Sequence, residues 1–240
     1  MFEEVGESAG VADGNNGSAL SGMGSDFRDG NNVGNNEFES LTVRTGLAFM
    51  TSQMSGWGEG MVDFANNGWK DLFVARSDVL DNINLLVPER RYAEPDSVIR
   101  NLGNDNFEDV SATARPDFQT PAPHRGVAFG DIDNDGRVDV VVSVLNAPVK
   151  FFHNLSGTGC HWILLNLEGT KSNRIAIGAQ VRLMTEDHAQ WNEVTTTVGY
   201  TSASDSRVHF GLKANQLIGE IEIGVAESNR SFTPLRWTVF

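Results

Sequence analysis

The sequence has almost no cysteine and comparatively few positive charges. Cys160 is the only cysteine among 240 residues, so no disulfide can form within the chain, and the redox compartment stays open. Lysine and arginine together number 18 against 32 aspartate and glutamate residues, which gives a formal net charge of −14. Such an acidic chain argues against nucleic acid as a partner, because phosphates require a basic surface, and against adsorption to anionic membranes. The excess of carboxylates instead favours cations as ligands.

Long apolar runs are missing as well. No stretch approaches the roughly 18 apolar residues of a membrane-spanning helix, and no signal peptide precedes Phe2. We therefore expect no membrane span and no export signal within this chain. Its 240 residues, 40% of them apolar, are enough for one large domain or two small ones, each with its own core.

Two features of the sequence repeat at almost the same spacing. The segment GEGMVDFANNGWKDLFVA, residues 58–75, aligns with GVAFGDIDNDGRVDVVVS, residues 126–143, at a shift of 68. A Phe-Glu pair with an aliphatic residue three positions after the phenylalanine begins at Phe2, Phe38 and Phe107. The last two of these lie 69 residues apart. Repeats of this length, built from short strands, are typical of propeller blades.

The local pattern is β along the chain. Apolar runs of four to eight residues alternate with turns rich in Gly, Asn, Asp and Ser, at residues 71–75, 138–145, 162–167, 179–184 and 218–225. Only residues 77–91 suit a helical turn. We therefore predict an all-β fold, with a partial β-propeller in residues 1–155 and a small β-sandwich-like domain in residues 160–240.

The stretch GDIDNDGRVDVVV, residues 130–142, has the spacing of a calcium loop. Calcium takes six to eight oxygen ligands, and acidic side chains at alternate positions of a tight loop supply them. Gly136 permits the sharp turn, but an EF-hand is excluded because Val142 stands where its final glutamate belongs. The candidate ligands are the carboxylates of Asp131, Asp133, Asp135 and Asp139 and the main-chain carbonyl of Arg137. The alternative is an acidic turn that is merely solvated.

The repeat carries a second, weaker copy of this loop. Asp63 and Asp71 keep the first and last carboxylates, Asn67 offers a neutral oxygen, and Ala65 replaces one ligand altogether. Such a set would bind calcium weakly or not at all. The alternative is a turn held by the side-chain hydrogen bonds of Asn66 and Asn67.

These motifs carry a resemblance to known families. FGDIDNDGRVDVVV, residues 129–142, resembles the calcium loop of FG-GAP or VCBS-type repeats. GTKSNRIAIGAQVRL, residues 169–183, and GYTSASDSRVHFGL, residues 199–212, resemble the two signatures of the ASPIC/UnbV domain of the cartilage acidic protein-like family. The resemblance implies an extracellular calcium-binding propeller followed by a small β domain, with no established catalytic activity.

The sequence departs from the family pattern in several places. The first repeat is short, with a worn loop at Asp29 and Asn31, and the Trp-Pro-Ser-Gly turn expected near the C-terminus is missing. A closed propeller also needs more blades than this chain supplies. We therefore expect a fragment or a decayed copy, whose open blade edges could pair with another chain.

Other candidate sites are discounted. GESAG, residues 6–10, matches a nucleophile elbow at Ser8, but the five residues before it cannot supply the buried strand that such an elbow requires. The five histidines show no zinc-binding spacing, and His209 is expected to pack or hydrogen-bond within its strand. Lys171 and Arg174 could hold a small anion, although a structural turn closed by Asn173 is favoured.

The function expected from the sequence is a non-enzymatic, secreted binding or adhesion-type module in which Ca2+ holds a propeller hairpin. Its partner would be an extracellular protein or glycan. Two alternatives stay open. One is an accessory factor or enzyme of a biosynthetic pathway, as the UnbV name suggests, and the other is a truncated fragment without function.

Overall fold

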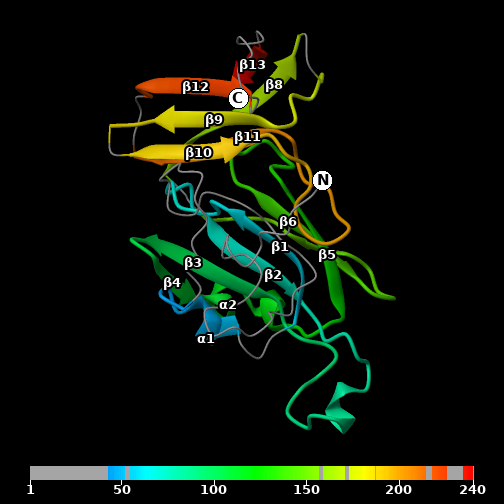
Figure 1. Cartoon of the computed structure of the whole chain (residues 1–240). Helices are drawn as coiled ribbons and strands as arrows, with labels where there is room; N and C mark the ends of the chain where they lie inside the picture. Colours follow the sequence, from blue (N-terminus) through cyan, green and yellow to red (C-terminus); the bar gives the residue numbers. More distant parts are fainter. Residues whose placement is uncertain are drawn as a thin grey trace, which may run out of the picture.

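The computed structural model describes residues 43–51, 55–156, 159–170, 173–186, 188–214, 218–225 and 235–239. Within these residues the chain is all-β, as the sequence predicts, and it forms four separate sheets (Figure 1). The described part has no helix long and apolar enough to cross a membrane. The expectations for Ser8 and for the worn loop at Asp29 and Asn31 lie outside the described residues.

The repeated region folds into two antiparallel sheets whose arrangement is consistent with propeller-like blades. The first contains, in order, β1 (Gly56–Val62), β2 (Asp71–Arg76), β3 (Ser97–Gly103) and β4 (Asn106–Asp109). The second contains β5 (His124–Gly130), β6 (Asp139–Val144) and β7 (Lys150–Phe152). The third Phe-Glu pair of the repeat falls in β4.

The repeat predicted from the sequence is reproduced in the strand register. In the first blade Val62 pairs with Asp71, and in the second Gly130 pairs with Asp139, so both pairs are shifted by 68 residues. The register slips once in each hairpin, between Gly56 and Glu59 and between His124 and Val127, again at equivalent positions. The two loops that follow β1 and β5 are therefore built on the same frame.

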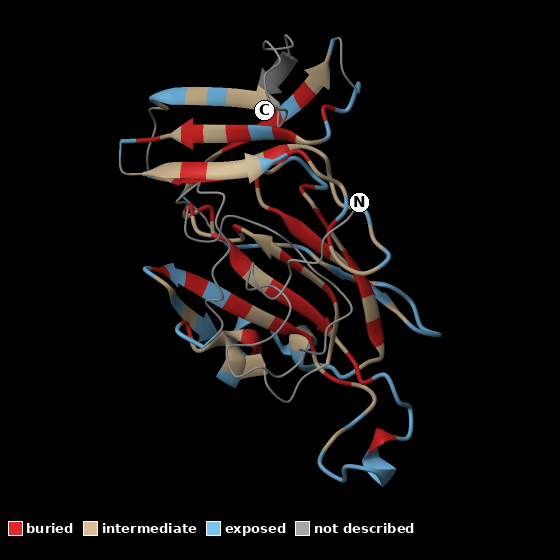
Figure 2. Ribbon diagram, viewed as in Figure 1, coloured by how far each residue is buried: buried red, intermediate tan, exposed pale blue. Residues whose placement is uncertain are grey.

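An apolar core lies between the two blades. It contains Phe73 and Ala75 of β2 and buried residues of β5 and β6, and the largest of these is Phe129. Figure 2 shows the buried residues that run along these strands. A Cβ on Gly58 would overlap the backbone of β5, so glycine is what lets β1 and β5 approach this closely.

The C-terminal region forms two three-stranded sheets. One contains β11 (Val208–Lys213), β8 (His161–Gly169) and β13 (Leu235–Val239), and the other contains β10 (Ala189–Glu193), β9 (Ala179–Met184) and β12 (Glu220–Val225). Both sheets contribute to one core, with Ile163, Val181 and Phe210 among its members. Two sheets sharing a core form a sandwich-like unit, as predicted. The domain limits at residues 155 and 160 stay a prediction.

The helical segments are single turns. The expected turn within residues 77–91 is confirmed as η1 (Ile83–Leu85). The expectation that no other segment would be helical was wrong, because α1 (Leu47–Thr51), α2 (Ser111–Ala114) and η2 (Pro116–Gln119) are also present. Segments of four or five residues are too short to show a helical period in the sequence.

Candidate metal centre

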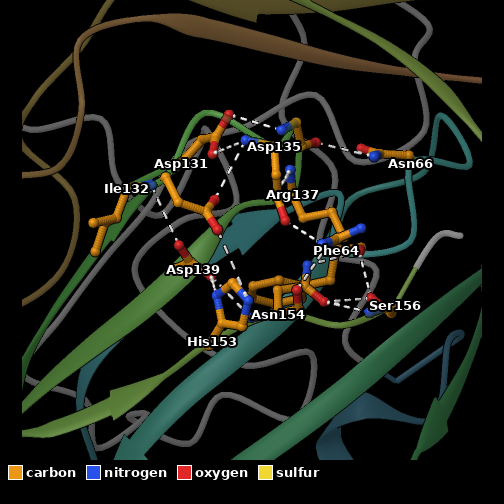
Figure 3. Close-up of polar contacts among 12 residues, drawn as sticks. Phe64, Asn66, Asp131, Ile132, Asp135, Arg137, Asp139, His153, Asn154 and Ser156 are labelled. Atoms are coloured by element: carbon orange, nitrogen blue, oxygen red, sulfur yellow. Dashed lines mark hydrogen bonds and ion pairs between the residues drawn. The ribbon is translucent and has the colours of Figure 1, made fainter.

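The acidic motif forms the loop between β5 and β6, and its two ends are buried. Asp131 directly follows β5 and is 3% exposed, while Asp139 begins β6 and is 1% exposed. The carboxylate of Asp131 accepts hydrogen bonds from the backbone amides of Asp135 and Gly136, at 3.0 and 2.9 Å. The loop is thus folded around one buried carboxylate (Figure 3).

Asp139 ties this loop to the end of β7. Its Oδ2 accepts the amide of Ile132 at 3.2 Å, and its Oδ1 accepts the amide of Asn154 at 2.8 Å. His153 Nδ1 lies 3.1 Å from the same Oδ1, and since a carboxylate can only accept, Nδ1 carries the proton. The loop and β7 therefore share one buried anchor.

The exposed side of the loop gathers a set of groups suited to a metal ion. Among the described residues, this set comprises Asp133, Asp135 and His153, whose ligand atoms all lie within 4.8 Å of one another. Two of the four predicted carboxylates belong to this set. The carboxylates of Asp131 and Asp139 lie outside it, and all four accept hydrogen bonds from backbone amides. The assignment of the five predicted ligands stays a prediction.

Sequence reasoning missed His153, because it lies 14 residues beyond Asp139 and belongs to no spaced motif. A signal for its position did exist. HNLS, residues 153–156, corresponds to RNLG, residues 100–103, at the end of the third strand of each blade. In both blades the backbone amide of the asparagine in this segment donates a hydrogen bond to the carboxylate of the last aspartate of the loop, at 2.8 Å.

The donors of the second loop fit calcium in chemical type. Calcium prefers oxygen ligands, and the loop offers carboxylates together with main-chain carbonyls. The loop is also held rigidly, because Arg137 donates to the carboxylate of Asp135 and, through Nε, to the carbonyl of Asn154 at 2.9 Å. A bound calcium ion would neutralise part of the carboxylate charge in this loop.

The first loop has the same hydrogen-bonded frame with fewer donors. Asp63 accepts the amides of Asn67 and Gly68 at 2.9 and 2.7 Å, as Asp131 accepts those of Asp135 and Gly136. Asn67 Oδ1 accepts the amide of Trp69 at 2.8 Å, so this side chain does help to close its own turn. The predicted ligands Asp63 and Asp71 belong to no cluster of three or more His, Cys, Asp or Glu ligand groups in the described part of the chain, and the assignment of Asn67 stays a prediction.

Burial raises the pKa of both carboxylates of the first loop. Burial raises the pKa of Asp71 from 3.8 to about 7, although hydrogen bonds from the amides of Asn101 and Phe64 act in the opposite direction. Burial also raises the pKa of Asp63, and the nearby His209 opposes this shift. Such shifts are expected where the desolvation of a buried carboxylate outweighs its hydrogen bonds and its attraction to nearby basic groups.

The C-terminal domain packs directly against both loops. Gly211 on β11 is so close to the first loop that a Cβ would overlap Asp63 Oδ2 and the backbone of Asn66. His209, two residues earlier on the same face of the strand, lies 3.0 Å from the carbonyl of Gly136 in the second loop. Because that carbonyl can only accept, His209 Nε2 carries the proton. Burial lowers the pKa of His209, opposed mainly by Asp63.

The two loops also contact one another at this point. Asn66 Nδ2 donates to the carbonyl of Gly136 at 3.0 Å, which is the same oxygen that His209 reaches. The alternative interpretation, in which Asn66 closes its own turn, is therefore not what the structure shows. Expecting His209 to hydrogen-bond was correct, but its partner lies on a blade and not in its own strand.

Arg207 adds a second set of contacts to the second loop. Its Nη2 donates to the carbonyl of Asp131 at 2.7 Å, and its Nη1 donates to Asn134 Oδ1 at 2.6 Å. The guanidinium is oriented by Asp205, whose Oδ2 accepts from Nε at 2.7 Å. One side chain of the C-terminal domain thus spans the first half of the acidic loop.

The segment before Arg207 covers the edge of β5 that β6 leaves free. Phe129 donates its amide to Ser204 Oγ at 3.1 Å and accepts the amide of Asp205 at 2.9 Å. Tyr200 packs edge-on against Trp57 of β1, with ring centroids 5.1 Å apart. The C-terminal domain therefore protects a strand edge that would otherwise be open to pairing.

The candidate anion site in the C-terminal domain proves to be a closed turn in its described part. Asn173 Oδ1 accepts the amide of Ile177 at 2.8 Å, and its Nδ2 donates to the carbonyl of the same residue at 3.1 Å. Arg174 pairs with Glu168 at 3.2 Å. Lys171 lies outside the described residues.

Comparison with known protein families finds a match in each of two segments of the chain. The family model of the FG-GAP-like repeat matches residues 63–142, which include both loops. The family model named ASPIC and UnbV matches residues 169–224, which include Arg207, His209 and Gly211. The resemblance predicted from the sequence is confirmed. A curated relative, cartilage acidic protein 1 from Mus musculus, is 38% identical over 66 residues. This match covers 27% of the present chain and 10% of the relative.

Proposed function

We propose that this chain is a non-enzymatic, calcium-binding module of a secreted protein, whose FG-GAP-like loop at 131–139 binds one calcium ion. The ion would be held by the carboxylates of this loop together with the Arg137 carbonyl. By offsetting carboxylate repulsion, it would stabilise the hairpin of β5 and β6. The stabilised blade would then present a surface to an extracellular protein or glycan.

The observation that carries this proposal is the hydrogen-bonded frame shared by the two loops. In both loops, the carboxylate of the first aspartate accepts the backbone amides four and five residues later. The carboxylate of the last aspartate accepts the backbone amide of the residue directly after the first aspartate. Only the second loop combines this frame with carboxylates at all four positions. A frame retained in two copies, with the full donor set in one, supports a cation site at that copy. The secreted location rests on the FG-GAP and ASPIC/UnbV matches and on the similarity to cartilage acidic protein 1.

Calorimetric titration with calcium tests the site, using the wild type, Asp133→Ala, and the exposed aspartate variant Asp81→Ala as a control. We expect one ion per chain for the wild type and the control, and no binding for Asp133→Ala. Thermal melts in calcium and in chelator should show a rise in Tm on adding calcium that Asp133→Ala loses. A wild type that neither binds calcium nor gains stability from it would refute the proposal.

A further inference from the structure

The contacts between the C-terminal domain and the acidic loop involve the backbone that shapes the cation site. Arg207 binds the carbonyl of Asp131, the first residue of the loop, and His209 binds the carbonyl of Gly136, which lies at its turn. These two carbonyls flank the stretch that carries Asp133 and Asp135. The side chain of Arg207 is 20% exposed, and that of Asp205, which orients it, is 24% exposed.

The turn itself is fitted to the C-terminal domain. Gly136 has a φ of +83°, and a Cβ there would overlap the ring of Trp162 on β8. Asn134, at the tip of the loop, has a φ of +59° and offers its Oδ1 to Arg207. At Asn134 this left-handed conformation is held by the surroundings, because residues other than glycine adopt it only at a cost.

We propose that Arg207 and His209 are positioning residues that hold the loop 131–137 in its ligand-presenting shape, so that the docked C-terminal domain raises the calcium affinity of the FG-GAP-like repeat. This inference rests on the proposed calcium site and adds that the site is completed across the two domains. By linkage, bound calcium must raise the equilibrium constant for docking by the same factor by which docking raises the calcium affinity.

One segment of the C-terminal domain, residues 207–211, contacts the two acidic loops through three different kinds of residue. Arg207 supplies a guanidinium donor, His209 a ring N–H donor, and Gly211 a close approach to the other loop. Packing alone would not require two donors aimed at main-chain carbonyls of one loop. Donors of this kind fix the direction of the peptide groups that they bind.

The test compares calcium affinities of the full chain, measured by calorimetry, for Arg207→Gln, His209→Gln and a matched control. Arg182→Gln is that control, because Arg182 also forms an ion pair, with Glu222 at 2.8 Å, but on the sheet of β9 and β12. We expect Arg207→Gln to bind calcium about tenfold more weakly, since a charged hydrogen bond to the loop is lost. His209→Gln should bind about threefold more weakly, and the control should match the wild type.

A second readout separates positioning from general stability. A merely structural role would lower Tm equally in calcium and in chelator, whereas loss of positioning should shrink the rise in Tm that calcium produces. Hydrogen exchange in chelator should also quicken at the amides of Asp135 and Gly136 in Arg207→Gln. In the wild type, calcium should slow exchange over residues 205–213.

A third variant acts from the loop side. Asn134→Gly removes the side-chain acceptor of Arg207 while glycine tolerates the positive φ, so the C-terminal domain itself is unchanged. It should weaken calcium binding in the same direction as Arg207→Gln, and it decides the matter should Arg207→Gln fail to fold. If the wild type binds calcium and the folded variants bind it equally well, the coupling is refuted while the calcium site stands. If the wild type does not bind calcium, both are refuted.

Discussion

Gly211 of the C-terminal domain lies directly against Asp63 of the first blade, with no room for a side chain between them. A Cβ at Gly211 would overlap Asp63 Oδ2 and the backbone of Asn66, while the φ of Gly211 is not in the left-handed region. The constraint is therefore steric. The sheet that contains Gly211 is therefore in contact with the loop at 63–71, which has fewer carboxylates than the loop at 131–139.

This contact predicts that Gly211→Ala destabilises the docked state. Overlap with backbone cannot be relieved by moving a side chain, so we expect a loss of about 2 kcal/mol in the free energy of unfolding. Chemical denaturation measures it. The matched control is Gly224→Ala on β12, where a Cβ would meet nothing within 4 Å. Equal effects of the two substitutions would contradict the close contact.

Asp131 and Asp133 should contribute differently to the free energy of unfolding when no metal is bound. The carboxylate of Asp131 accepts two backbone amides and is buried, whereas the side chain of Asp133 is 50% exposed. In chelator, Asp131→Ala should therefore cost about 2 kcal/mol, because the buried amide of Gly136 loses its acceptor and the amide of Asp135 loses the nearer of its two acceptors. Asp133→Ala should change stability in chelator by less than about 0.5 kcal/mol. Denaturation midpoints of both variants in chelator check this, and similar values would be inconsistent with the observed frame.

Much of the fold was predictable because local patterns and tertiary structure agree in the blades. Short apolar runs between turn residues locate β2, β6 and β9 to within a residue or so. The shift of 68 residues predicted equivalent hairpins, and the strand registers are equivalent. A loop closed by bonds between residues four or five apart is readable from the sequence.

The docking of the C-terminal domain was not predictable in the same way. The bonds from Arg207 to Asp131 and from His209 to Gly136 join residues more than 70 positions apart, and no local pattern encodes them. His153 was missed for a related reason, since it reaches the loop from another strand. Gly211 carried a hint, because a glycine inside a strand often marks the close approach of another element.

Asp71 should give the protein a pH dependence in the absence of calcium. Its pKa is about 7 in the folded chain, against the ordinary aspartate value of 3.8 in an unfolded chain, so between these values the native state holds a proton that the unfolded chain has released. The free energy of unfolding should therefore fall as pH rises from about 4 to about 7, and this contribution should level off above pH 7. Asp71→Asn should flatten the slope, whereas the exposed control Asp81→Asn should not. Urea midpoints in chelator across this range test the sign, and an unchanged slope in Asp71→Asn would contradict it.

The equivalence of the two loops predicts that calcium binding can be installed in the first. Asp63 and Asp71 already occupy the frame positions of Asp131 and Asp139, and Ala65 and Asn67 stand where the second loop has Asp133 and Asp135. In the double variant Ala65→Asp/Asn67→Asp, a bound ion would also relieve the cost of burying Asp71. We expect the calorimetric stoichiometry to rise from one ion to two, while the control Ala65→Ser/Asn67→Asp stays at one. A stoichiometry of one in both would mean that the backbone frame does not suffice, and that contacts from outside the loop, such as those of Arg207 and His209 to the second loop, are also required.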